Sequence, residues 1–215
     1  MTEKPRVDPS RRAATRRSLH GVAELVLAGP QYRTSGSIEL RVTPGGFATT
    51  VAPDLRVEGL HVVAGDIRAP LEEGRSYAEL AATIGVTASR LDDVYADGPG
   101  LGEDEQLDVE QAAAAEIAEA FRIGGEAMRM LAPAERPILW PEHFDVGITV
   151  ARVNYGLSPG DAAIDEPYAY VGPWEPASYE GAFWNAPFGA AQRLTGLGGV
   201  AAVLAFFREG QRLTS

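Results

Sequence analysis

The 215-residue chain has no cysteine, and it has one lysine beside eighteen arginines. The missing cysteines exclude disulfide bonds, thiolate nucleophiles, cysteine-ligated zinc and iron–sulfur clusters. Acid–base chemistry therefore depends on the three histidines and thirty carboxylates. A cysteine-free chain suits a reducing compartment, so we expect a cytoplasmic protein.

Long apolar runs are also missing, because none approaches the roughly 20 residues that a transmembrane helix needs. The first residues lack the apolar stretch and cleavage site of a secretory signal, so we expect no membrane partner. No Gly-x-Ser-x-Gly elbow, Gly-x-x-x-x-Gly-Lys loop or strand-linked Gly-x-Gly-x-x-Gly occurs, and we predict no cofactor. The hydrophobic fraction of 45% and charged fraction of 23% are ordinary for a globular domain.

The net charge of −11 is unevenly distributed. Residues 1–17 hold six of the nineteen basic residues, and we interpret them as a basic flexible tail. Residues 18–215 then form a single domain that is more acidic than the whole chain. Phosphate backbones repel such a surface, so nucleic acid is not a favoured partner.

Residues 92–110 contain eight acidic side chains and no basic one. A solvated acidic loop that leads into a helix is the favoured interpretation, and a divalent-cation site is the alternative. Calcium loops place oxygen ligands at alternating positions around a glycine turn, and the spacing here does not match the EF-hand pattern. We therefore predict no metal.

The hydrophobic pattern predicts an α+β fold in which an antiparallel β-sheet is covered by two long α-helices. Alternating residues indicate a hairpin that turns at 43–46, further strands to about residue 67, and a second β-rich stretch over 148–171. Short consecutive strands without intervening helices favour antiparallel pairing.

The two long helices are predicted over 108–131 and 190–212, where apolar residues recur at helical spacing. The Ser76-to-Glu79 spacing is that of a capping box, so a shorter helix should begin there. Helical spacing over 18–28 predicts another short helix, which Gly29-Pro30 should end.

Residues 140–188 hold all three tryptophans and ten of the seventeen aromatic residues. Concave sites are usually apolar with a few convergent polar groups, so this aromatic and proline-rich loop segment is the predicted pocket. Within it, 158–161 reads as a turn, and 181–188 as a lid or a dimer contact. The predicted ligand-binding residues are Trp140, Asn154, Asp161, Tyr168, Tyr170, Trp174, Trp184 and Asn185.

The hexapeptide Trp140-Pro-Glu-His-Phe-Asp145 carries the predicted catalytic residues. In an extended strand, His143 and Asp145 would share one face, while Glu142 and Phe144 would share the other. His143 would then be a general base that Asp145 or Glu142 orients. A structural histidine that caps a strand end is the alternative.

The other histidines, His20 and His61, are distant in the sequence. With His143 they could form a three-histidine zinc site only if the fold gathered them, and no ligand spacing supports this.

Residues 77–95 resemble the helix-turn-helix of bacterial transcription regulators, with Gly85 at the turn. A recognition helix should offer basic or amide side chains to the major groove. Here Arg90 stands beside Asp92 and Asp93, so a packed helical pair without DNA binding is the favoured interpretation.

The order of these features resembles a broad bacterial family of uncharacterised conserved proteins. The pieces that match are Leu19-His20, Trp140 to Asp145, the Glu-Pro-Tyr-x-Tyr run over 166–170, and the apolar helix at 204–207. The arginine-rich, lysine-poor composition is similar to that of actinobacterial proteins. The resemblance implies one domain with a shared aromatic pocket, and it carries no known activity.

Three hypotheses follow. The first is a protein that binds an unidentified small molecule in the aromatic pocket. Under this hypothesis the protein could also be an enzyme that uses a His/carboxylate pair. The second is a non-catalytic interaction or assembly protein, in which the loop over 181–188 and the C-terminal helix form a homodimer interface. The third is a DNA-linked regulator that uses residues 77–95.

Overall fold

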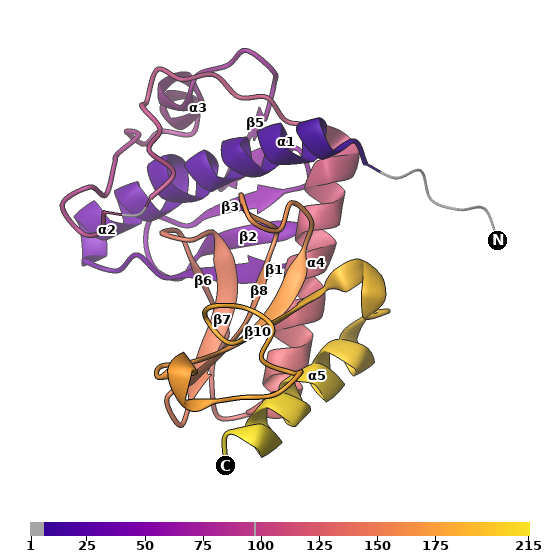
Figure 1. Cartoon of the computed structure of the whole chain (residues 1–215). Helices are drawn as coiled ribbons and strands as arrows, with labels where there is room; N and C mark the ends of the chain where they lie inside the picture. The colour runs from indigo at the N-terminus through magenta and orange to yellow at the C-terminus, as the bar shows by residue number, and fades with distance from the viewer. Residues whose placement is uncertain (1–6, 97) are drawn as a thin grey trace.

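Ten antiparallel strands form one continuous sheet in the order β10-β9-β8-β7-β6-β1-β2-β3-β4-β5 (Figure 1). The computed structural model describes residues 7–96 and 98–215. The predicted α+β class and antiparallel sheet are confirmed. The strands are β1 Leu40–Thr43, β2 Gly46–Thr49, β3 Leu55–Glu58, β4 His61–Ala64, β5 Ile67–Pro70, β6 Ile138–Trp140, β7 Asp145–Val150, β8 Val153–Ser158, β9 Tyr168–Pro173 and β10 Ala190–Arg193.

The sheet has two halves that meet where β1 pairs with β6 through Leu40 and Leu139. Strands β1 to β5 are a meander of short hairpins, and the predicted turn between residues 43 and 46 is confirmed. Strands β6 to β10 form the second half, which runs in a clearly different direction in Figure 1. Helix α4 contacts strands of both halves and holds them together.

The helices differ from the prediction mainly at the N-terminus. The chain forms α1 Pro9–Gly21, a π-helix over Val22–Ala28, α2 Gly29–Ser35, α3 Tyr77–Thr83, α4 Gln111–Leu131 and α5 Val200–Leu213, with short 3-10 turns at Pro176–Ser178 and Leu194–Gly196. The capping box at Ser76 and the long helix α4 are confirmed. Within the described residues, no helix is both long and apolar enough to cross a membrane.

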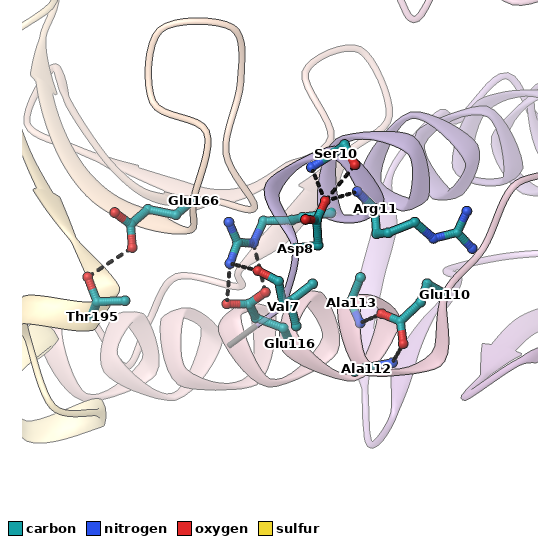
Figure 2. Close-up of polar contacts among 11 residues, drawn as sticks. Val7, Asp8, Ser10, Arg11, Glu110, Ala112, Ala113, Glu116, Glu166 and Thr195 are labelled. Atoms are coloured by element: carbon teal, nitrogen blue, oxygen red, sulfur yellow. Dashed lines mark hydrogen bonds and ion pairs between the residues drawn. The ribbon is translucent and has the colours of Figure 1, made fainter. Parts of the chain in front are cut away.

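The predicted flexible tail is wrong from residue 9 onward, because α1 begins there. Asp8 caps this helix by accepting hydrogen bonds from the amides of Ser10 and Arg11 (Figure 2). Arg12 pairs with Glu116 of α4 at 2.8 Å, and the Thr15 hydroxyl accepts from the Glu110 amide at 2.9 Å. These contacts fix α1 against α4, whereas residues 1–6 lie outside the described part.

Gly29-Pro30 does not end the first helix. A π-helix precedes the proline, and the Gly29 amide donates to the Glu24 carbonyl in this wider turn. An added Cβ at Gly29 would lie 2.0 Å from the Ser89 carbonyl oxygen. Gly29 is therefore required because the backbone at Ser89 packs closely against it, and it does not end the helix.

Two further helix predictions are wrong. Residues 190–193 form β10, which pairs with β9, so the C-terminal helix begins only after Gly199. The helix-turn-helix prediction fails because the described residues between α3 and α4 form no helix. Asp97 lies in this interval and is outside the described residues. Without a second helix, residues 77–95 have no recognition element.

Candidate functional site

A pocket of about 850 Å³ lies between α1 and the β7–β9 part of the sheet. Its walls combine aromatic rings with a small number of charged groups. The lining residues are Ala13, Arg16, Arg17, His20, Pro99, Glu142, His143, Phe144, Asp145, Asn154, Ser158, Pro159, Gly160, Asp161, Tyr168, Tyr170, Gly172, Pro173, Trp174, Pro176 and Phe188.

One wall of the pocket is a face of α1. Ala13, Arg16, Arg17 and His20 follow one another at intervals of three and one, so they share one side of the helix. Ala13, Arg16 and Arg17 are not among the predicted site residues because residues 1–17 resemble a tail, and His20, which follows that tail, was considered only as a zinc ligand. The Asp8-Pro9 pair, a cap followed by proline in the first turn, is the signal that could have found the helix.

The opposite wall is one face of strands β8 and β9. Side chains alternate along a strand, so Tyr168, Tyr170 and Gly172 of β9 share this face. Asn154 of β8 lies directly across from Gly172. Its Oδ1 accepts from the Thr149 hydroxyl at 2.8 Å and from the indole N–H of Trp174 at 3.3 Å.

The hexapeptide Trp140–Asp145 is a tight turn between β6 and β7, so the prediction of an extended strand is wrong. Trp140 pairs with Asp145, and the Phe144 amide donates to the Trp140 carbonyl at 2.8 Å. Phe144 has a φ of 51°, which reverses the chain. His143 is consequently exposed on the turn, whereas Asp145 is buried at the start of β7.

Phe144 anchors this turn in the core. Its ring makes edge contacts with the rings of Phe47 of β2 and Phe121 of α4, and it stacks on His20. The distances between ring centroids are 5.6, 5.2 and 5.3 Å respectively. The position of Asp145 therefore follows from core packing.

Asp145 is the most deeply buried acid in the pocket, with 9% of its surface exposed. Its Oδ2 accepts a short hydrogen bond from the Tyr170 hydroxyl, but its Oδ1 has no partner. Burial raises the pKa of Asp145. The hydrogen bond from Tyr170 and the nearby charge of His143 lower it, but they do not cancel the effect of burial. Burial and the adjacent Asp145 also raise the pKa of Tyr170 well above its usual value.

Glycines make the Asp145–Tyr170 contact possible. Tyr170 reaches Asp145 across β8, and an added Cβ at Gly156 would lie 2.2 Å from Cζ of the tyrosine ring. Gly147 lies across from Gly156 on β7 and also leaves this face free of side chains.

Asp161 has a structural role at the rim. Its carboxylate accepts from the Tyr168 hydroxyl at 2.6 Å and from the amides of Ala163 and Ile164 at 2.7 and 2.8 Å. Burial alone would raise the pKa of Asp161, but these bonds and the charge of Arg16 hold it below its usual value.

His20 is neutral at physiological pH. Its Nε2 lies 2.7 Å from the Pro141 carbonyl oxygen, and because a carbonyl only accepts, Nε2 carries the proton. Burial lowers the pKa of His20 to about 4. The ring therefore presents an uncharged surface to the pocket.

Most of the predicted ligand-binding residues come together in the pocket, but three do not. Trp140 lies at the end of β6, Trp184 packs on Tyr179 and Phe183, and Asn185 hydrogen-bonds the backbone of Ala191. None of the three lines the pocket.

The loop over 181–188 is divided between two places. Phe183 packs on Phe206 of α5, while Phe188 reaches the pocket and contacts Tyr170 at 6.2 Å between ring centroids. The loop therefore covers part of its own chain, and the homodimer stays a prediction.

The structure does not gather the three histidines. His61 lies on β4 in the first half of the sheet, away from His20 and His143. Among the described residues, no cluster of three metal-ligating side chains occurs. In the acidic segment, Glu105 pairs with Arg17, Asp108 pairs with Arg11, and Glu110 caps α4.

In comparisons with known proteins, no family model, curated protein or solved structure matches the chain. The function is therefore argued from the pocket.

Proposed function

We propose that the protein binds a small organic molecule in the pocket between α1 and strands β7 to β9. The volume of about 850 Å³ lies within the range of ligand sites, and the mixture of aromatic walls with a few charged groups is typical of them. The cysteine-free composition and the absence of a membrane-spanning helix in the described residues support our placement in the cytoplasm.

The observation that carries this proposal is a pair of unsatisfied atoms. Asp145 Oδ1 and Arg16 Nη1 are buried and have no hydrogen-bond partner, although both residues line the pocket. Leaving a buried polar group unpaired costs about 1–3 kcal/mol, and more for a charged one. A ligand in this pocket would supply the missing partner to both atoms.

An enzymatic role would use Asp145 before His143. The buried carboxyl, with a raised pKa and Tyr170 on one oxygen, suits a general acid that gives a proton from Oδ1. His143 also lines the pocket, but it is exposed on the adjacent turn. This reverses the order of roles that the sequence suggested.

A thermal-shift screen tests the binding proposal. The panel contains carboxylates, phosphates, amines and neutral aromatic compounds, and it is run on the wild type and on Gly172→Leu. Gly172 lines the pocket, and an added Cβ there meets nothing closer than 3.5 Å, so the leucine fills the pocket without a clash at its base.

The matched control is Gly196→Leu, at an exposed glycine whose added Cβ would meet nothing within 4 Å. We expect compounds that stabilise the wild type and the control but not Gly172→Leu. Stabilisation of all three proteins alike would contradict a ligand site in this pocket.

A further inference from the structure

We propose that the ligand of this pocket is a small organic anion, whose carboxylate or phosphate group is bound by Arg16 and whose apolar body lies against Trp174 and Phe188. This inference rests on the proposed function and adds the charge and shape of the ligand.

The four arginines of α1 differ in whether they pair with a carboxylate. Arg11 pairs with Asp108 at 2.9 Å, Arg12 with Glu116 at 2.8 Å, and Arg17 with Glu105 at 3.0 Å. Arg16 forms no ion pair with the described residues. Its Nη2 donates to the carbonyl oxygen of Asp161 at 3.3 Å, and its Nη1 donates to nothing.

The guanidinium of Arg16 is also partly withdrawn from water, whereas the more deeply buried Arg12 has Glu116 as its partner. Burial lowers the pKa of the Arg16 guanidinium, and Asp161 and Asp165 compensate only from a distance. The carboxylate of Asp161, whose charge acts on Arg16 more strongly than that of Asp165, already accepts three hydrogen bonds from other groups. A desolvated guanidinium without a close counter-charge is the arrangement that a carboxylate or phosphate completes, because its planar fork matches their oxygens.

Asp145 could argue for a cationic ligand instead, but its contacts favour an anion. A carboxylate this buried needs several donors to stay charged, and Tyr170 is the side chain that donates to it. In the protonated form, Oδ2 accepts from Tyr170 and Oδ1–H is a donor. Arg16 and protonated Asp145 then each offer a donor to an anion in the pocket that both residues line.

The shape of the ligand follows from the exposed rings at the pocket. Trp174 is 59% exposed and Phe188 is 40% exposed, and both line the pocket. The Arg152 guanidinium lies over the Trp174 ring at 5.5 Å and covers one of its faces. An apolar body bound against these two rings would remove their uncovered surface from water.

The unpaired atoms of Arg16 and Asp145 are shielded from bulk water. Side-chain rotation on binding is common, and because both residues line the pocket, we expect each side chain to rotate when it contacts the ligand.

Three probes with the same phenyl body test the charge: 4-phenylbutanoate, phenyl phosphate and 4-phenylbutylamine. Trp174 becomes the one remaining tryptophan when Trp140 and Trp184 are replaced by phenylalanine, so its fluorescence reports binding at the pocket. We expect the carboxylate or the phosphate to change the emission and the amine not to; which of the two binds identifies the anionic group.

Variants then locate the charge. Arg16→Gln should weaken anion binding about tenfold to a hundredfold, the range for one charge-assisted contact. Arg11→Gln, on the same helix but outside the pocket, should bind as the parent does. Asp145→Asn keeps an acceptor for Tyr170 and a donor for the ligand, so it should strengthen anion binding.

Three results would overturn the inference. Binding of the amine that is lost in Asp145→Asn would show a cation site, and the proposed function would survive. Anion binding that is equal in Arg16→Gln and Arg11→Gln would remove Arg16 from the site. A lower melting temperature of ligand-free Arg16→Gln would also contradict the inference. An unpaired buried charge destabilises the protein, so its removal should not lower the melting temperature. If no probe binds and no library compound distinguishes Gly172→Leu, the proposed function fails as well.

Discussion

At the scale of single residues, the polar groups of the pocket differ in whether they have hydrogen-bond partners. Asp145 and Arg16 each keep one buried atom without a hydrogen-bond partner, whereas the Asp161 carboxylate accepts three hydrogen bonds and His20 Nε2 bonds the Pro141 carbonyl. Residue types alone could not make this distinction, because the same carboxylate is structural at Asp161 and unsatisfied at Asp145. The first pair is therefore assigned to ligand binding and the second pair to the frame of the site.

His20 should make the stability of the protein sensitive to acid. Its pKa is about 4 when folded and 6.5 in its ordinary state, so the unfolded chain takes up the proton first as the pH falls. Its contribution to stability is complete above about pH 6.5 and is lost by about pH 4, an effect of roughly 3 kcal/mol.

His20→Gln keeps a side-chain N–H for the Pro141 carbonyl and does not titrate. Urea denaturation at about pH 7 and about pH 4.5 should show a smaller loss of unfolding free energy in this variant than in the wild type. Equal losses in the two proteins would mean that His20 is not buried in a neutral form.

Gly156 should be essential for the Asp145–Tyr170 contact. In Gly156→Ala, the new Cβ would overlap the Tyr170 ring, so the ring must move and Asp145 loses its hydrogen bond. We expect a loss of about 1–3 kcal/mol in the free energy of unfolding.

Gly147→Ala is the matched control for this prediction. Gly147 lies opposite Gly156 on the neighbouring strand, and its added Cβ would be 3.5 Å from the nearest atoms, an ordinary contact. A loss as large in Gly147→Ala as in Gly156→Ala would show that the cost comes from the strand backbone and not from Tyr170.

At the scale of elements, α1 supplies a wall of the pocket and packs along α4. The sequence concealed it, because six basic residues within 1–17 resemble a solvated tail. Four of the six belong to α1, and three of those four are paired with carboxylates of other segments. Pairing with distant residues cannot be read from local composition.

Deleting part of α1 should destabilise the protein. A chain that begins at residue 18 loses the Arg12–Glu116 pair and the Thr15 contact with Glu110. The deletion also uncovers the surfaces of α4 and the π-helix against which α1 packs, so we expect a clearly lower melting temperature by circular dichroism. A chain that begins at residue 7 keeps these contacts and is the control; equal melting temperatures of the two chains would support a dispensable tail.

The hexapeptide shows the limit of periodicity. Alternation over Trp140 to Asp145 predicted that His143 and Asp145 would share a strand face. The chain instead turns at Phe144, whose ring enters the core between α4 and β2. Tertiary packing of one aromatic residue decided which side chain is buried, and no local pattern contained that information.

At the scale of the whole molecule, the class and the main elements were predictable from the sequence. The hairpin at 43–46, the capping box at Ser76 and the helix α4 each depend on local spacing, and each is confirmed. The pairing of β1 with β6, and the position of α1 beside β7 to β9, join residues far apart in the chain. Part of the aromatic segment lines the pocket, together with a wall from α1 that the sequence pattern did not indicate.

Ligand binding in the pocket between α1 and strands β7 to β9 can be observed directly at its tryptophan. The most direct measurement is the indole N–H signals of Trp174 and Trp184 in NMR spectra recorded while a stabilising compound is added. Trp174 lines the pocket, whereas Trp184 lies in the loop outside it. We predict that the Trp174 signal shifts and saturates while the Trp184 signal stays in place, and that Gly172→Leu abolishes the shift. A saturating shift of Trp184 without one of Trp174, or an unchanged shift of Trp174 in Gly172→Leu, would contradict ligand binding in this pocket.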